Sequence, residues 1–133
     1  MLGRKKITTE DDPGRSKPVG PFVNPPPEEI VGRIGSFHQL LLNKYCIYRP
    51  MLLLPTLEYA PQNDNLDRSD FAASWAVMKA FKTPQMVIYN CGVNSGSSQG
   101  HKHLQLFPLP KLEHFKLFPS SAKSTEGRFI PDR

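Results

Sequence analysis

The sequence predicts an α+β fold, in which an antiparallel sheet of four or five strands carries one main helix over 67–83. Short apolar runs separated by turn-forming residues indicate the strands, and only one segment has helical periodicity. The order is strand, strand, helix, strand, glycine-rich loop, strand, which favours an antiparallel sheet over repeated β-α units. His38 lies in a leucine-rich run and is expected to be structural. The predicted strands span 37–42, a stretch within 45–54, 85–90 and 101–107.

Proline separates the start of the chain from this core. The chain has 133 residues, the size of one domain, and 14 of them are proline. Six prolines precede residue 28, and such segments resist helix and sheet interiors because proline lacks a backbone donor. We therefore expect a Pro-rich extended arm over 1–28, one folded domain over 29–118 and a tail over 119–133.

The helix predicted over 67–83 has clear start and stop signals. Asp67 or Ser69 can cap its first turn, and a proline follows its last residue. Three large apolar side chains recur at positions i, i+4 and i+7, namely Phe71, Trp75 and Met78. This spacing predicts one apolar helix face that packs against the sheet as core.

Charge and cysteine content bear on partners and compartment. Seventeen Lys and Arg against twelve Asp and Glu give a net charge of +5, but no segment is strongly basic. Because a nucleic-acid groove needs clustered Lys and Arg, we expect no nucleic-acid partner, whereas a mild positive balance suits small polyphosphates. No apolar run approaches the ~20 residues of a membrane helix, and no secretory leader is evident. Cys46 and Cys91 predict free thiols in a reducing compartment, so we expect a cytoplasmic or nuclear protein with no membrane partner.

The most informative motif is Gly-His-Lys-His-Leu-Gln-Leu-Phe at 100–107. Residues two apart in a strand face the same side, so His101, His103 and Gln105 are expected to form one polar row. Lys102 faces the other side of the strand and is predicted to be a surface lysine. For the His-x-His pair alone, the alternatives are a solvent-exposed strand face and a metal site, although a third metal ligand is missing nearby.

Directly before this motif lies a loop at 91–100 with three glycines and three serines. Such a loop lets backbone N–H groups converge on an anion. It is neither a Walker A loop nor a dinucleotide-binding fingerprint, because no Gly-Lys-Ser/Thr opens a helix and the next element is a strand. A phosphate-binding loop that leads into a histidine strand indicates attack of a neutral imidazole on phosphorus.

Three segments resemble a known family: Leu-Leu-Asn-Lys-Tyr at 41–45, Tyr-Asn-Cys-Gly-Val-Asn-Ser-Gly-Ser-Ser-Gln at 89–99, and His-Lys-His-Leu-Gln-Leu at 101–106. Over about two thirds of its length the chain resembles the amino-terminal catalytic region of fungal diadenosine tetraphosphate phosphorylases, also called ATP adenylyltransferases, of the histidine-triad superfamily. The resemblance implies a histidine-triad-like nucleotide-binding domain over 29–118. Gln105 stands where the hydrolase branch has histidine, and so resembles the transferase branch.

The resemblance also implies an activity and a set of site residues. The reaction would split diadenosine tetraphosphate with inorganic phosphate into ATP and ADP through a covalent nucleotidyl-histidine. His103 would be the nucleophile, the backbone carbonyl of His101 would orient its ring, and Gln105 would hydrogen-bond the transferred phosphoryl group. The substrate-binding residues would be Asn43, Lys44, Asn90, Gly96, Ser97, Ser98 and Gln99.

The implied partners are small molecules, nucleotide and inorganic phosphate, with no resident metal or required cofactor; Mg²⁺ would arrive with the nucleotide. Chains of the family are more than twice as long, and residues after Lys111 do not resemble theirs. Two alternatives therefore stay open: a nucleotide-binding fragment without turnover, and a histidine-triad hydrolase of dinucleoside polyphosphates. A homodimer would cover a sheet face that is otherwise exposed.

Overall fold

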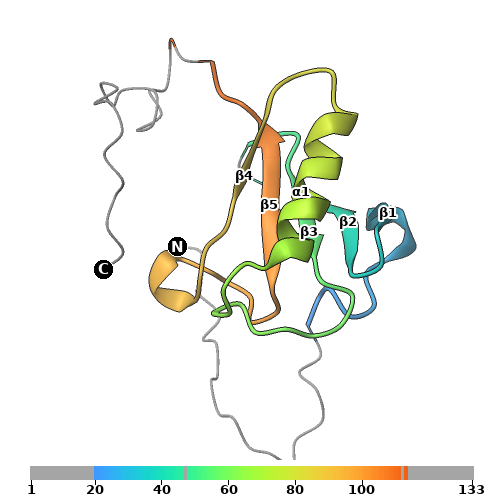
Figure 1. Ribbon diagram of the computed structural model, residues 1–133, viewed down its shortest axis with the longest axis vertical. Helices are drawn as coiled ribbons and strands as arrows, with labels where there is room; N and C mark the ends of the chain where they lie inside the picture. The colour runs from blue at the N-terminus through green and yellow to red at the C-terminus, as the bar shows by residue number, and fades with distance from the viewer. Residues whose placement is uncertain (1–19, 47, 112, 114–133) are drawn as a thin grey trace, which may run out of the picture.

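The fold is a five-stranded antiparallel sheet with one helix packed on a face of it (Figure 1). The computed structural model describes residues 20–46, 48–111 and 113. The strand order is β1-β2-β3-β5-β4, which confirms the predicted α+β fold. The elements are η1 (Pro27–Glu29), β1 (Ile30–Ile34), β2 (His38–Leu42), β3 (Leu52–Pro55), α1 (Arg68–Ala80), β4 (Gln85–Ile88), η2 (Val93–Ser95) and β5 (His103–Pro108). The predicted tail over 119–133, His114 and the first 19 residues of the arm lie outside the described residues.

The strand β1 is absent from the sequence prediction, which places the first strand at 37–42. Its sequence, Ile-Val-Gly-Arg-Ile, has a glycine in the middle, and glycine weakens the strand signal. The pairing with β2 shifts register between Ile30 and Gly32, so apolar and polar positions do not alternate cleanly. The turn that returns the chain onto β2 contains Gly35 at φ 61°, a left-handed conformation that glycine adopts without strain.

The hydrophobic core lies between the sheet and α1. It is built from leucines of the central strands and from two small residues of the helix. The buried members are Leu40, Leu52, Leu54, Ala73, Val77, Leu104 and Leu106. The alternation predicted for β5 is thus confirmed at its leucines, which face the helix and leave the other face of that strand for the site.

The helix α1 begins as predicted but is shorter and is turned differently. The side chain of Asp67 accepts hydrogen bonds from the N–H groups of Ser69 and Asp70. The side chain of Asp70 in turn accepts one from the N–H of Asp67, which completes a capping box. The helix ends at Ala80 instead of reaching Thr83, because the chain becomes extended at the next residue before entering β4.

The prediction that Phe71 and Trp75 pack into the core is wrong. Phe71 is 62% exposed and Trp75 is 63% exposed, whereas Asp70, Ala73, Ser74 and Val77 are buried. Successive helix positions are rotated by about 100°, so the buried face lies about one residue away from the aromatic stripe. The small residues let the helix approach the sheet closely, and the polar contacts of Asp70 fix which face turns inward.

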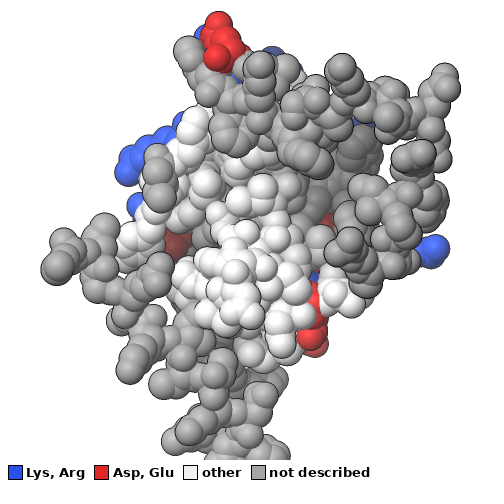
Figure 2. Space-filling model, turned by 90° about the vertical axis from the view of Figure 1, so that its left-hand side faces the viewer, with Lys and Arg blue, Asp and Glu red and all other residues white. Residues whose placement is uncertain are grey.

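The exposed aromatic side chains border a shallow hollow of about 220 Å³ between α1 and β4. Its wall includes Phe71, Trp75, Val87 and Tyr89. The side of the molecule that carries β4, an edge strand, presents a broad uncharged surface in its described part (Figure 2).

The burial difference along α1 predicts unequal mutational costs. We expect Val77→Ala to lower the free energy of unfolding by about 2 kcal/mol, because Val77 is only 2% exposed and its methyl groups fill the core. Trp75→Ala should cost less than about 1 kcal/mol despite the larger side chain, because most of that side chain already contacts water. Urea unfolding followed by circular dichroism measures both. A larger cost for Trp75→Ala would contradict the orientation of the helix.

Candidate active site

A cavity of about 500 Å³ lies where the end of β2, the start of β5, the arm and the glycine-rich loop meet. It brings together six of the ten predicted site residues, although they come from distant parts of the sequence. These six are Asn43, Lys44, Ser98, Gln99, His103 and Gln105. The other four, Asn90, Gly96, Ser97 and His101, do not line it. The arm contributes Phe22 to the wall, and this residue was not among those predicted.

His103, the first residue of β5, presents one ring nitrogen to the cavity. Its Nδ1 lies 2.8 Å from the backbone oxygen of His101. Because a carbonyl only accepts, Nδ1 carries the proton and Nε2 keeps a lone pair. Nε2 forms no hydrogen bond with a described residue and is not sealed from solvent. The residue is otherwise buried, and the ring of Phe22 packs against it at 5.0 Å between centroids.

His101 does not share the position of His103, so the predicted row of three is only partly formed. It lies before β5, in an isolated bridge with Pro61. The Thr56 hydroxyl donates to the Glu58 carbonyl at 2.7 Å, so at 3.0 Å it accepts a hydrogen bond from Nε2 of His101. The ring is therefore turned away from the cavity, and its Nδ1 is the one buried side-chain polar atom without a partner among the described residues.

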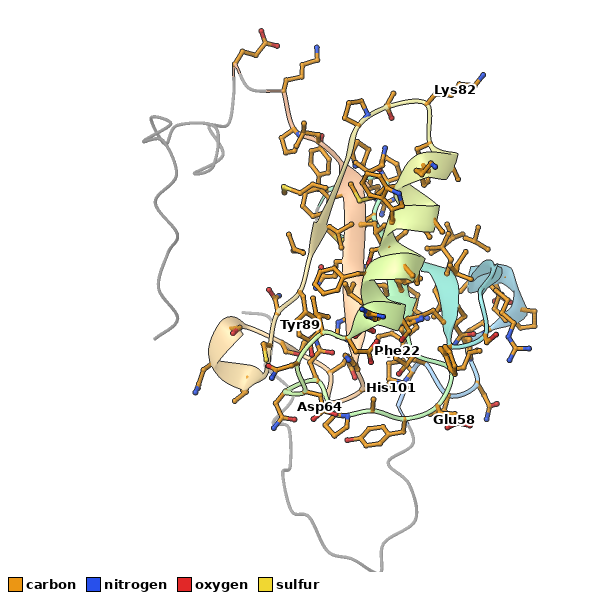
Figure 3. The ribbon with its side chains drawn as sticks, in the orientation of Figure 1. Phe22, Glu58, Asp64, Lys82, Tyr89 and His101 are labelled. Carbon is orange, nitrogen blue, oxygen red and sulfur yellow. The ribbon has the colours of Figure 1, made fainter. Side chains whose placement is uncertain are left out.

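Figure 3 shows His101 beside Phe22. The ring centroids of Phe22 and His101 are 5.7 Å apart, and Tyr59 packs on the other side at 5.4 Å. This aromatic enclosure, together with that of His103, places both imidazoles in a dry environment. Desolvation consequently lowers the pKa of both rings below the usual 6.5.

The lowered pKa values predict how stability depends on pH. The folded chain resists protonation of His101 and His103, while the unfolded chain takes up these protons below pH 6.5. The unfolded state then binds more protons, so the free energy of unfolding should be constant above neutrality and fall as the pH drops below 6.5. Urea midpoints between neutral and mildly acidic pH measure this, and His101→Gln should flatten the curve. A midpoint that rises on acidification would contradict the lowered pKa values.

The glycine-rich loop is partly folded on itself. Gly92 and Gly96 have φ values of 76° and 86° and flank η2. The N–H groups of residues 95, 96 and 97 donate to carbonyls within the loop, and the Ser97 hydroxyl donates to the carbonyl of Gln99. The N–H groups of Ser98 and Gln99 donate to no described residue. Ser98 and Gln99 are also the loop residues that line the cavity, so their N–H groups are the ones placed to receive an anion there.

Asn43 and Lys44, which follow β2, also line the cavity. The Lys44 ammonium group is 2.9 Å from a carboxylate oxygen of Glu29, and this hydrogen bond raises the pKa of Lys44. Lys44 is exposed, so its charge is free to turn toward the cavity. Asn43 accepts a hydrogen bond from the N–H of Tyr45 and contacts the sulfur of Met51. Asn90 does not line the cavity, and its backbone oxygen accepts a hydrogen bond from the side-chain amide of Gln62.

The prediction of a surface position for Lys102 is wrong. Lys102 is 4% exposed, and its ammonium group pairs with Asp70 and donates to the carbonyl of Asn65 at 2.9 Å. Asp70 also accepts a hydrogen bond from His38, whose Nε2 is 2.8 Å away. The expectation of a structural role for His38 is thus confirmed. This buried network ties the start of α1 to β2 and to the residue between His101 and His103.

Two further observations concern metals and membranes. Among the described residues, no three His, Cys, Asp or Glu side chains gather in a way that could hold a metal ion. No helix in the described part of the chain is long and apolar enough to cross a bilayer.

In the described residues, the antiparallel sheet, the helix packed on it and a strand histidine with a free ring nitrogen at an open cavity define an α+β domain with one candidate site. The chain belongs to the Ap4A phosphorylase N-terminal domain family, whose model matches residues 2–123.

Individual relatives agree with this assignment. The chain is 34% identical over 128 residues to diadenosine tetraphosphate phosphorylase 2 of Saccharomyces cerevisiae, covering 87% of this chain and 39% of that protein. It is 34% identical over 108 residues to the yeast protein APA1, covering 77% of this chain and 33% of that one. The chain therefore spans well under half the length of these relatives.

Solved structures show the same relationship. The crystal structure of yeast Ap4A phosphorylase Apa2 in complex with Ap4A matches with a TM-score of 0.70 and 34% identity, over 85% of this chain and 42% of that one. The complex of Apa2 with AMP matches with a TM-score of 0.62 and 38% identity, over 68% and 34%. A Plasmodium falciparum diadenosine triphosphate hydrolase matches at 16% identity and a TM-score of 0.51, over 64% of this chain and 63% of that one, which shows a shared fold alone.

Proposed function

We propose that this chain is the nucleotide-binding and nucleotidyl-transferring part of a diadenosine tetraphosphate phosphorylase. The observation that carries the proposal is the Nε2 atom of His103, unprotonated and facing a cavity whose walls offer anion donors. Membership of the family and the similarity to Apa2 bound to Ap4A support the choice of substrate.

In the first step Nε2 of His103 attacks the α-phosphorus of one adenosine half. The bond from that phosphorus to its bridging oxygen breaks, ATP leaves, and AMP remains on the imidazole. In the second step an oxygen of inorganic phosphate attacks the same phosphorus, the phosphorus–nitrogen bond breaks, and ADP leaves. The carbonyl of His101 holds the Nδ1 proton throughout and stabilises the positive charge on the ring.

Charge on the transferred phosphoryl group must be met by fixed donors. The free N–H groups of Ser98 and Gln99, the amide of Gln105 and the ammonium of Lys44 are available around the cavity. Gln105 follows His103 by two residues on β5, so it faces the same side. Its neutral amide can donate a hydrogen bond but cannot act as a general base toward water. This favours phosphate over water as the acceptor.

The lowered pKa of His103 supports the chemistry. A nucleophilic imidazole must be neutral, and burial keeps the pKa of His103 below 6.5. The rate of AMP transfer should therefore be insensitive to pH near neutrality and decline only on the acid side of 6.5.

The direct test incubates the purified chain with diadenosine tetraphosphate, with and without inorganic phosphate. With phosphate we expect repeated turnover to ATP and ADP. Without phosphate we expect a single equivalent of ATP, no ADP, and a mass increase of one AMP on the chain. Repeated turnover to ATP and AMP without phosphate would instead support a histidine-triad hydrolase.

A second candidate function is nucleotide binding without turnover, which is favoured by the 39% coverage of the yeast relative. Calorimetry with AMP and with diadenosine tetraphosphate distinguishes the two. Binding without an adduct or product would support this candidate, and absence of binding would exclude both. The partners in either case are small molecules, with Mg²⁺ arriving on the nucleotide. The free thiols Cys46 and Cys91 support a reducing compartment such as the cytoplasm.

A further inference from the structure

Gln62 is a buried amide that contacts the reactive histidine from outside the cavity. It lies in the connection between β3 and α1 and is 3% exposed. Its Oε1 accepts a hydrogen bond from the N–H of His103 at 2.7 Å. Its Nε2 donates to the carbonyl of His103 at 3.2 Å and to the carbonyl of Asn90 at 2.9 Å. One side chain thus satisfies both backbone groups of His103.

The sheet explains why a side chain is needed there. On one edge of β5, His103 pairs with Pro55 of β3. On the other edge β4 pairs with β5 only as far as Ile88 and Gln105. Continuing that register would bring Asn90 opposite His103, but the amide of Gln62 lies between them and supplies the hydrogen bonds of the missing strand. The Gln62 side chain thus separates β4 from β5 next to His103, and both backbone groups of His103 still have hydrogen-bond partners.

The backbone of Gln62 holds both ends of the glycine-rich loop. Its N–H donates to the carbonyl of Gly100 at 2.9 Å, and its carbonyl accepts from the N–H of Gly92 at 3.1 Å. The Tyr89 hydroxyl donates to the same carbonyl at 2.6 Å. Figure 3 shows Tyr89 at the end of β4, where the chain enters this loop. A single residue therefore fixes the peptide of His103 and the closure of the loop that carries Ser98 and Gln99.

We propose that Gln62 is a positioning residue, which fixes the backbone of His103 so that its ring meets the carbonyl of His101 and directs Nε2 into the cavity. Only glutamine offers one acceptor and two donors at this reach. Glutamate keeps the acceptor and loses both donors, and methionine keeps the length and loses all three bonds. The positioning role is defined by contacts within the chain, while its consequence for AMP transfer rests on the proposed function.

The test compares Gln62→Met and Gln62→Glu with the wild-type chain. The control is Gln85→Met, which removes another buried glutamine amide, one whose hydrogen bonds within the described residues all go to Thr83. Hydrogen exchange measures the N–H of His103 against that of Leu106 on the same strand, and ¹⁵N shifts of the His103 ring report which nitrogen is protonated. In Gln62→Met the N–H of His103 should exchange at least about tenfold faster relative to Leu106, and the share of the Nδ1–H tautomer should fall. Gln62→Glu should keep that N–H protected, because the carboxylate still accepts.

The rate of AMP transfer in a single turnover should fall at least about tenfold in Gln62→Met and stay at the wild-type value in Gln85→Met. If the His103 N–H of Gln62→Met exchanges at the wild-type rate and its ring keeps the wild-type share of the Nδ1–H tautomer, the positioning role is overturned, whether or not the chain transfers AMP. Equal acceleration of exchange along all of β5 in both Gln62 variants would also overturn it, because that pattern means general loosening. If the wild-type chain neither binds nor transfers nucleotide, the proposed function fails while exchange and tautomer still decide the role of Gln62.

Discussion

His103→Ala is expected to lower AMP transfer by a factor of about a thousand or more, because it removes the attacking nitrogen. The variant should fold, since the ring makes one side-chain hydrogen bond and the backbone bonds to Gln62 remain. Intact-mass measurement after incubation with diadenosine tetraphosphate should show the AMP adduct on the wild-type chain and none on the variant. Chromatography of the nucleotides should show matching loss of ATP and ADP.

The matched comparison is Gln105→Ala, which leaves the nucleophile in place. We expect an intermediate loss of about 10- to 100-fold, since one donor to the phosphoryl group disappears while His103 can still attack. An undiminished adduct on His103→Ala would place the nucleophile on another side chain. Equal effects of the two variants would mean that His103 acts by binding rather than by covalent transfer.

Asp70→Asn is expected to lower the free energy of unfolding by about 3–5 kcal/mol, which is a large share of the stability of a small domain. Asp70 is fully buried and receives three groups: the ring of His38, the ammonium of Lys102 and the N–H of Asp67. An amide of the same size cannot balance the Lys102 charge, which then stays buried without a counter-ion. Urea unfolding gives the loss from the shift in midpoint.

Two comparisons make this prediction specific. Glu29→Gln, at the exposed pair with Lys44, should leave the midpoint nearly unchanged because water screens that pair. The double variant Asp70→Asn with Lys102→Met should recover part of the loss, since it removes the stranded cation. An Asp70→Asn chain with the wild-type midpoint would show that Lys102 escapes to solvent and that the network adds little.

The parts of the fold that were predictable are those set by local sequence. The helix cap at Asp67 and the inward leucines of β5 follow from spacing within a few residues, and the antiparallel sheet follows from the order of elements along the chain. The face of α1 was not predictable in this way, because it depends on a polar anchor, Asp70, reaching His38 and Lys102 from two other elements. Hydrophobic spacing alone selected the larger aromatic residues, which remain exposed.

In the site, too, local sequence predicts some features while contacts between distant residues decide the others. His103, Gln105 and the end of the loop could be found because strand alternation and glycine content are visible in the sequence. The orientation of His101 depends on the hydroxyl of Thr56, 45 residues away, and could not be found locally. Gln62 gives no signal in the sequence, because a single glutamine near a turn is ordinary. Its importance comes from the gap between β4 and β5 that it fills.

The buried position of Phe22 determines where the smallest intact folding unit can begin. Its side chain is 5% exposed, touches both histidine rings, and its carbonyl accepts a bond from Gln39 at 2.9 Å. A shortened chain that starts at β1 would lack Phe22 and would therefore expose the rings of His101 and His103 to water. The unit that encloses His101 and His103 begins inside the proline-rich region, no later than Phe22.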